Sequence, residues 1–159
     1  MPTGARGFEP ELTAFTCGYC AYMSGDTAGA LRIQYPATIK VLRLPCTGKV
    51  DPRYLLTAFE EGADGVCVIA CPIGNCHHVR GNERARARVE RVKKLLDAVG
   101  LGGERLEIFF LSGGMGESFA ASVREMTDRV RALGPNPLRP GAASPEAAET
   151  GGVGGEVRS

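Results

Sequence analysis

The type and spacing of the cysteines in this chain indicate a chemical role. The sequence has 159 residues and six cysteines, and two of these stand three positions apart in the stretch FTCGYCAY, residues 15–22. Sulfur pairs at this spacing bind soft metals, exchange disulfides or fill space in a core. Cys46 lies in LPCTGKVDP, and Cys71 and Cys76 lie in IACPIGNCHH. Which chemistry applies depends on whether these distant segments meet in the folded chain.

Four short apolar runs predict the strands that would position these cysteines. The runs are continuous rather than alternating, which is typical of a parallel sheet whose two faces are both covered by helices. The predicted strands are Leu12–Thr16, Ile39–Leu44, Val66–Ala70 and Leu106–Leu111.

Helical patterns occur between these runs. Asp51 followed by Pro52 is typical of a helix start, and Gly62 stands where a C-cap belongs. The predicted helices are a short one within Gly18–Gln34, one that begins at Pro52, one over Asn82–Val99, and one that carries Phe119–Leu133.

The alternation of strands and helices predicts an α/β domain with a small doubly wound, flavodoxin-like sheet of four parallel strands flanked by helices. We expect this domain to span residues 10–135, after an N-terminal arm of residues 1–9. Residues 136–159 are dominated by proline, glycine, alanine and serine, so they predict a disordered C-terminal tail.

Five of the six cysteines follow predicted strand ends. Because the carboxyl ends of parallel strands meet at one edge, these five should become neighbours there. Gathered thiolates repel one another unless a cation or cluster shares their charge, and four of them match zinc or an iron–sulfur cluster. The pair Cys17 and Cys20 and the pair Cys71 and Cys76 could each serve one iron of a [2Fe–2S] centre, with Cys46 close by. Spacing alone does not choose four ligands from the five.

The other side chains that could take part in chemistry are expected to have structural or supporting roles. Cys67 lies within the third strand, which predicts a small buried apolar residue. His77 and His78 follow Cys76, and we expect them to be polar loop residues or to support the sulfur ligands. The loop LSGGMGESF, residues 111–119, departs from nucleotide-binding motifs and is expected to cover the metal site or face a partner. No Ser/His/Asp set indicates catalysis, so the chain has the features of an electron carrier.

Composition excludes several classes of function. The formal net charge of +1 argues against a nucleic-acid binder, and the basic stretch RGNERARARVERVKK predicts one helix with a solvated face. No apolar run reaches about 18 residues, so no membrane span is expected. The start, MPTGARGFEP, lacks the apolar core of a secretory signal. We therefore expect a cytoplasmic protein with reduced thiols, which favours metal or redox chemistry over structural disulfides.

Two other classes of function compete with an iron–sulfur carrier. A structural zinc module that docks partners is compatible with the number of cysteines, although structural zinc normally organises domains with little core. A thiol–disulfide oxidoreductase could use Cys17 and Cys20, because their motif follows a strand and precedes a helix. That second alternative leaves the other edge cysteines without a role.

The chain resembles the delta subunit of methyl-viologen-reducing hydrogenase over about residues 10–135, in FTCGYCAY, RIQYPATIKVLRLPCTGKVDP and FEEGADGVCVIACPIGNCHH followed by Gly81-Asn82. The resemblance implies a component of an anaerobic oxidoreductase complex that is not catalytic alone and carries a [2Fe–2S] cluster. It also implies electron relay between a hydrogenase or formate dehydrogenase and a flavin-containing core like the A subunit of heterodisulfide reductase. The matching ligand positions, of which four would hold the cluster, are Cys17, Cys20, Cys46, Cys71 and Cys76.

Overall fold

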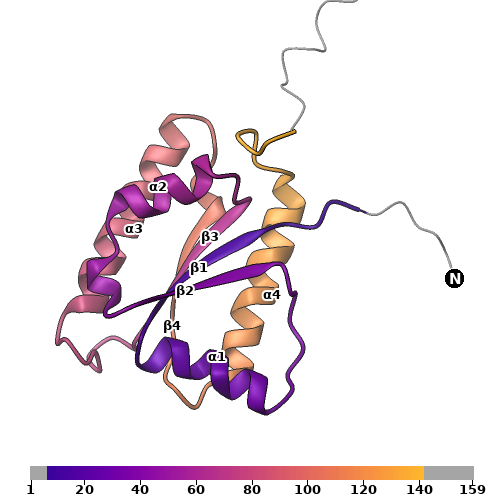
Figure 1. The fold of residues 1–159 in the computed structure, drawn as a ribbon. Coiled ribbons are helices and arrows are strands. Elements are labelled where there is room, and N and C mark those ends of the chain that lie inside the picture. The colour runs from indigo at the N-terminus through magenta and orange to yellow at the C-terminus, as the bar shows by residue number, and fades with distance from the viewer. Residues whose placement is uncertain (1–6, 142–159) are drawn as a thin grey trace, which may run out of the picture.

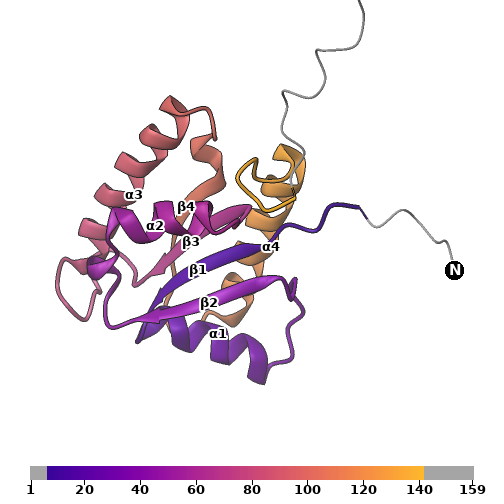
Figure 2. The ribbon, with the colours of Figure 1, turned by 45° about the horizontal axis from the view of Figure 1, so that its top comes forward.

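Four parallel strands form one sheet in the order β2-β1-β3-β4. The computed structural model describes residues 7–141, and Figure 2 shows β2 at one margin of the sheet, beside β1. All four predicted strands are confirmed, each within one residue of its predicted ends. They are β1 (Leu12–Cys17), β2 (Ile39–Leu44), β3 (Gly65–Ala70) and β4 (Leu106–Phe110).

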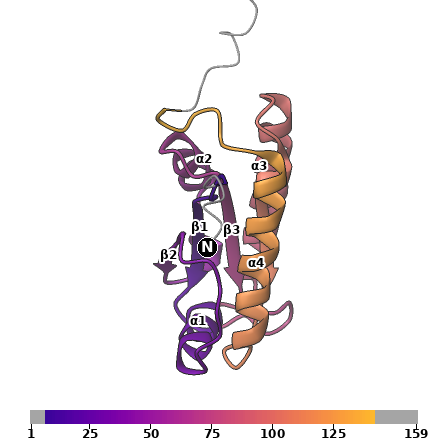
Figure 3. The same cartoon turned by 90° about the vertical axis from the view of Figure 1, so that its right-hand side faces the viewer.

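Helices cover both faces of this sheet, so the doubly wound α/β prediction is confirmed. Helices α1 and α4 pack on one face, and α2 and α3 pack on the other (Figure 1). The two long helices, α3 and α4, run alongside the strands (Figure 3). In the part of the chain that is described, no helix is long and apolar enough to cross a bilayer. The helices are α1 (Cys20–Ala30), α2 (Pro52–Glu60), α3 (Gly81–Ala98) and α4 (Gly116–Leu133).

The predicted ends of α2 are formed by the residues that the sequence indicates. The Asp51 carboxylate accepts a hydrogen bond from the backbone N–H of Arg53 at 2.8 Å, which satisfies one free donor of the first turn. Pro52 occupies the first helical position, where its missing N–H is not needed. Beyond the helix, Gly62 has a φ of +102°, a conformation that a residue with a side chain rarely adopts.

The central strands β1 and β3 are buried along their whole length, as their continuous apolar sequences predict. The same prediction is wrong for β2, whose middle residues are exposed. Val41 and Leu42 keep 39% and 46% of their surface because the helices lie over the central strands and leave this edge strand uncovered. The sequence of β2 is apolar enough for a covered strand, but its place at the margin of the sheet decides its exposure.

A buried polar network closes the amino-terminal end of the sheet. The Asp64 carboxylate accepts hydrogen bonds from the backbone N–H groups of Glu11 at 2.9 Å and Asn136 at 2.8 Å, and from the Arg139 guanidinium at 2.8 Å. Buried Arg105 donates to the carbonyl oxygens of Asp64 at 3.0 Å and Gly134 at 2.9 Å. The ordered fold therefore continues past residue 135, to which the domain was expected to extend. The rest of the predicted tail, residues 142–159, and residues 1–6 of the predicted arm lie outside the described residues.

Glu107 on β4 links the edge of the sheet to helices from both faces. Its carboxylate lies 3.1 Å from the Lys93 ammonium of α3 and 2.9 Å from the Arg129 guanidinium of α4. Burial raises the pKa of this carboxyl, but hydrogen bonds from Arg129, the backbone N–H of Ile108 and Lys93 outweigh burial and hold the pKa below its ordinary value.

We expect Glu107→Gln to lower the free energy of unfolding at pH 7 by about 1 kcal/mol. The folded pKa of Glu107 is depressed, so its contribution is present above the unfolded pKa of about 4.3 and is lost as the pH falls through the folded pKa. Urea unfolding at pH 7, 5 and 4 should therefore show a difference from the wild type that shrinks toward pH 4. Glu104→Gln, at an exposed position without an ion pair in the described residues, is the control. Equal effects of the two substitutions would contradict this role of Glu107.

Candidate metal centre

The fold brings the five predicted ligand cysteines to the carboxyl edge of the sheet. Cys17 ends β1, Cys20 begins α1, Cys71 directly follows β3, and Cys76 lies in the loop between β3 and α3. Cys46 follows β2 and stands before a short 3-10 turn, Thr47–Lys49. All six cysteines of the chain are free thiols.

Three of these cysteines form a first sulfur group, made of Cys17, Cys20 and Cys71. The Sγ atoms of Cys17 and Cys71 lie 3.4 Å apart, and both side chains are buried. The backbone N–H of Ala21, in the first turn of α1, donates to Cys17 Sγ at 3.3 Å. Cys20 is near enough for its charge to raise the pKa of Cys71. Cys17 and Cys71, which are 54 positions apart in the sequence, are thus in direct contact.

Cys46 and Cys76 form a second sulfur group beside Gly81, the first residue of α3. A Cβ atom at Gly81 would collide with Cys46 Sγ and approach Cys76 Sγ to 3.3 Å. A Cβ atom at Gly48 would lie 2.7 Å from the Gly81 Cα, so the two backbones pack against each other directly. The backbone N–H of Gly48 also donates to Cys46 Sγ at 3.3 Å. Two glycines therefore permit the close approach of this sulfur group.

The crowding of the thiols perturbs their proton affinities. Burial, reinforced by the hydrogen bond and charge of Cys17, raises the pKa of Cys71 to about 12. Burial also raises the pKa of Cys46. At Cys76, burial acts in the same direction, but the backbone N–H groups of His78, Asn82 and Gly81 outweigh it and lower the pKa. A cation that bound these sulfurs would displace their protons.

The chemical nature of this donor set fits a soft metal. Five thiols at one edge exceed the four sulfur ligands that a tetrahedral zinc ion or a [2Fe–2S] cluster requires. Within residues 7–141, however, no three or more His, Cys, Asp or Glu side chains are already arranged as a metal site. The sulfurs stand in two adjacent groups, since the charge of Cys17 in the first group acts on Cys46 in the second. Which four of the five would ligate stays a prediction.

Asn82 is a buried residue that holds this edge together, and apart from the family resemblance the sequence predicts no role for it. Its Nδ2 atom donates to the carbonyl oxygens of Cys71 at 2.9 Å and Pro72 at 2.8 Å. Its Oδ1 atom accepts from the backbone N–H of Glu83 at 2.9 Å. Asn82 therefore fastens the start of the cysteine loop to the first turn of α3. A polar amide at the start of a predicted helix was the signal that could have identified it.

Aromatic side chains join the two cysteine-bearing loops at the surface. The Tyr19 ring, from between Cys17 and Cys20, stacks on the His77 ring with centroids 3.9 Å apart. His78 lies edge-on to His77, with centroids 5.3 Å apart. The histidines thus lie in the loop beside Cys76, as expected, and both contact the Tyr19 ring of the opposite loop.

Two further sequence features have structural roles. Cys67 is buried within β3, and burial raises the pKa of its thiol to about 12, so its prediction as a buried apolar residue is confirmed. The glycine-rich loop before α4 packs against α1, where Thr27 Oγ1 donates to the carbonyl oxygen of Gly113 at 2.8 Å.

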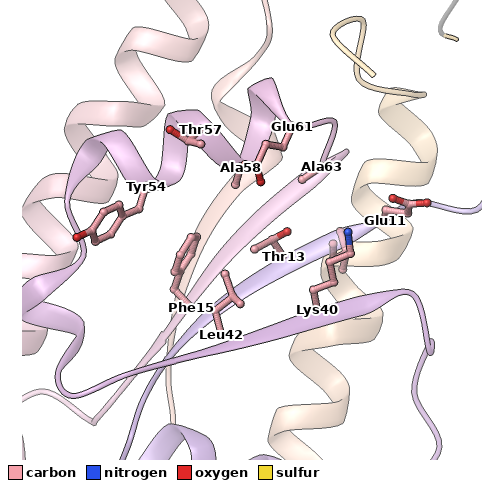
Figure 4. Close-up of a pocket in the computed structure, with 11 residues that line it drawn as sticks. Glu11, Thr13, Phe15, Lys40, Leu42, Tyr54, Thr57, Ala58, Glu61 and Ala63 are labelled. Carbon is pink, nitrogen blue, oxygen red and sulfur yellow. The ribbon is translucent and has the colours of Figure 1, made fainter. Parts of the chain in front are cut away.

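A groove of about 340 Å³ lies between α2 and the sheet, and none of the cysteines lines it. Phe15 and Leu42 line it from the sheet, and Tyr54 and Ala58 line it from α2 (Figure 4). The uncovered strand β2 forms part of the floor of this groove, and α2 forms its wall. Its lining has no set of side chains arranged for catalysis, so we place the candidate chemistry at the cysteine edge.

Known proteins resemble this chain over most of its length. The family described as "Methyl-viologen-reducing hydrogenase, delta subunit" matches residues 12–134. The iron-sulfur D subunit of the F420-non-reducing hydrogenase vhu of Methanocaldococcus jannaschii is 47% identical over 131 residues, which cover 82% of this chain and 98% of the relative. The corresponding protein of Methanococcus maripaludis is 48% identical over the same coverage.

A second type of relative is much longer than this chain. The A subunit of the ferredoxin/F(420)H(2)-dependent CoB-CoM heterodisulfide reductase of Methanosarcina acetivorans is 36% identical over 126 residues. The match covers 79% of this chain but only 16% of that protein. A domain similar to this chain is therefore also found within a larger polypeptide.

The packing around Gly81 leads to a prediction about stability. We expect Gly81→Ala to lower the free energy of unfolding by about 1–3 kcal/mol, because its Cβ would displace Cys46 and Cys76 in a close-packed site. Gly29→Ala, within α1 and with no atom within 4 Å of the added Cβ, should instead raise stability by up to about 1 kcal/mol. Urea denaturation followed by circular dichroism measures both. If Gly81→Ala is as stable as Gly29→Ala, the two sulfurs do not need this close approach.

Proposed function

Because the chain belongs to the methyl-viologen-reducing hydrogenase delta subunit family, we propose that it is an electron-transfer subunit carrying one [2Fe–2S] cluster. It relays electrons between a hydrogenase or formate dehydrogenase module and a flavin-containing core that resembles the A subunit of heterodisulfide reductase. It acts as part of an oxidoreductase complex and has no catalytic activity alone.

The observation that carries this proposal is the meeting of five thiols at one edge of the sheet. Contacts between Cys17 and Cys71, and of Cys46 and Cys76 with Gly81, join segments from β1, β2 and β3. Thiols are the donors that iron–sulfur clusters require, and this edge is where open α/β sheets bind ligands. Cys17 and Cys71 also belong to one apolar layer of the core, but Cys46 belongs to neither layer, so core packing alone does not explain all five thiols.

Four of Cys17, Cys20, Cys46, Cys71 and Cys76 would hold the cluster. When bound, it supplies one-electron redox chemistry. Backbone N–H groups at the start of α3, which lower the pKa of Cys76, would stabilise a thiolate ligand there and shift its potential. Asn82 would keep the loop that begins at Cys71 in place.

The two types of relative support the proposed partners. Some relatives are named as iron-sulfur subunits of hydrogenases, and others are the A subunits of heterodisulfide reductases. A domain that exists both as a separate protein and within the longer chain is expected to work beside that chain. The separate protein would then dock where the fused domain lies.

The thiol–disulfide alternative is less well supported by the site. In that mechanism Cys17 and Cys20 would exchange a disulfide with a substrate. Instead the sulfur in contact with Cys17 is that of Cys71, and both are buried. A buried thiol is a poor nucleophile toward a protein disulfide.

Reduced protein should give direct spectroscopic support for the cluster. After anaerobic purification and reduction with dithionite, we expect an S = ½ EPR signal with about two irons and two sulfides per chain. Iron, zinc and sulfide are assayed on the same sample. About one zinc per chain with no EPR signal would instead identify a structural zinc site.

A cysteine series identifies the ligands. Each edge cysteine is replaced singly by alanine, and iron content is measured after anaerobic reconstitution. We expect four of the five variants to bind less than about half of the wild-type iron, since each lacks a required ligand. Cys67→Ala is the control, because Cys67 lies inside the core and should retain full iron content. Unchanged iron content in all five edge variants would place the metal elsewhere.

A further inference from the structure

A second pocket, of about 450 Å³, opens directly beside Cys46. Its walls come from the turn after β2 and from the first two turns of α3. Three cationic side chains line it, Lys49, Arg84 and Arg88, and we call this set the basic pocket. Lys49 follows Cys46 by three residues, and Arg84 follows Gly81 by three residues, which is one helical turn. The cations therefore border the second sulfur group.

The cations that line the basic pocket outnumber its carboxylates, because Asp51 is the one acidic side chain among its lining residues. None of its three cations forms a salt bridge within residues 7–141, although the chain has a formal net charge of only +1. The acidic groups nearby are already engaged. Asp51, which also lines the pocket, accepts from the backbone and side chain of Arg53 at 2.8 and 3.3 Å. Glu83 pairs with Arg80 at 2.7 Å.

The shape of the basic pocket is fixed by Arg88. Its Nη1 atom donates to the carbonyl oxygens of Gly48 at 2.6 Å and Val50 at 2.9 Å, which ties α3 to the turn after β2. Lys49 and Arg84 have no such bond and are exposed at the rim. Two exposed cations on a fixed base are suited to meet anionic groups that arrive from solution.

We propose that the basic pocket is a docking surface for an acidic face of the electron-transfer partner, which approaches the candidate cluster from the side of Cys46. This inference rests on the proposed function, because it takes the cysteine edge as the place where electrons leave. Charges at the rim of an interface mainly raise the association rate and orient the partner. Such steering suits a protein whose sulfur edge must face its partner when the two associate.

A protein face fits the basic pocket better than a nucleic acid does. Farther along α3, Arg86 pairs with Glu90 and Lys93 pairs with Glu107, so carboxylates neutralise part of the positive charge of the helix. A polyanionic backbone requires such a stripe, whereas a few carboxylates on a protein surface require only a local cluster. Among the cations of α3 without a salt bridge in residues 7–141, Arg84 and Arg88 line the pocket beside Cys46, whereas Arg91 and Lys94 do not.

The test uses the full chain after anaerobic reconstitution, and its probe is a flavoprotein from the same organism that resembles the A subunit of heterodisulfide reductase. Association is measured by surface plasmon resonance between about 20 and 300 mM NaCl, a range over which screening changes strongly. Lys49→Glu/Arg84→Glu reverses two charges at the pocket. Arg91→Glu/Lys94→Glu makes the same change of charge toward the other end of α3, at two exposed positions without salt bridges in residues 7–141, and is the matched control.

We expect the pocket variant to associate at least about tenfold more slowly than the wild type at low salt, with a flatter salt dependence, while the control changes less than about threefold. Equal slowing of both variants would mean that only net charge matters, and no change in either would remove the docking role; both results overturn the inference. Absence of binding by the wild type at every salt concentration also overturns it.

Iron content and the EPR signal, measured on all samples, report on the proposed function separately. A loss of iron in the pocket variant with normal association would overturn the docking role and assign these cations to the cluster instead.

Discussion

Parallel hydrogen bonding of β1 with both β2 and β3 is the constraint on which the rest of this structure depends. In this register Cys17 lies opposite Leu44, and Thr16 lies opposite Ile69, so the three strands end nearly together. Each cysteine-bearing segment then starts from the same edge, although the segments are separated by a helix in the sequence. A shift of one residue in either pairing would turn the side chains of that strand to the other face and separate the sulfurs.

The two ends of the sheet have different tasks. At the amino end, Asp64, Arg105 and Asn136 are buried and contribute to stability, and within residues 7–141 no buried side-chain polar atom lacks a hydrogen-bond partner. At the carboxyl end, Cys20 and Cys76 remain partly exposed, and the protein packs thiols whose proton affinities burial has raised. Thiols that are buried without a metal contribute little to folding, whereas binding a metal would stabilise them as thiolates. The carboxyl end is therefore suited to hold a metal, and the amino end is suited to hold the fold together.

Close backbone approach sets the form of the cysteine edge. Gly48 and Gly81 let the turn after β2 contact the first turn of α3, and Arg88 fastens the same two segments by hydrogen bonds. The contact places Cys46 and Cys76 beside the same residue, Gly81. It also leaves Lys49 and Arg84 at the rim, so one packing arrangement determines both the sulfur positions and the local charge.

The sequence by itself determined the strands, the helices and the convergence of five cysteines, because apolar periodicity and strand ends are local signals. It also identified Cys67 as a core residue from its position inside an apolar run. Only the tertiary structure decided that Cys17 contacts Cys71, that Cys46 and Cys76 meet beside Gly81, and that Asn82 secures the loop that begins at Cys71. It also decided that β2 is exposed and that Asn136 belongs to the fold. The reason is that contact, coverage and burial depend on which segments pack together across the chain, and no local pattern carries that information.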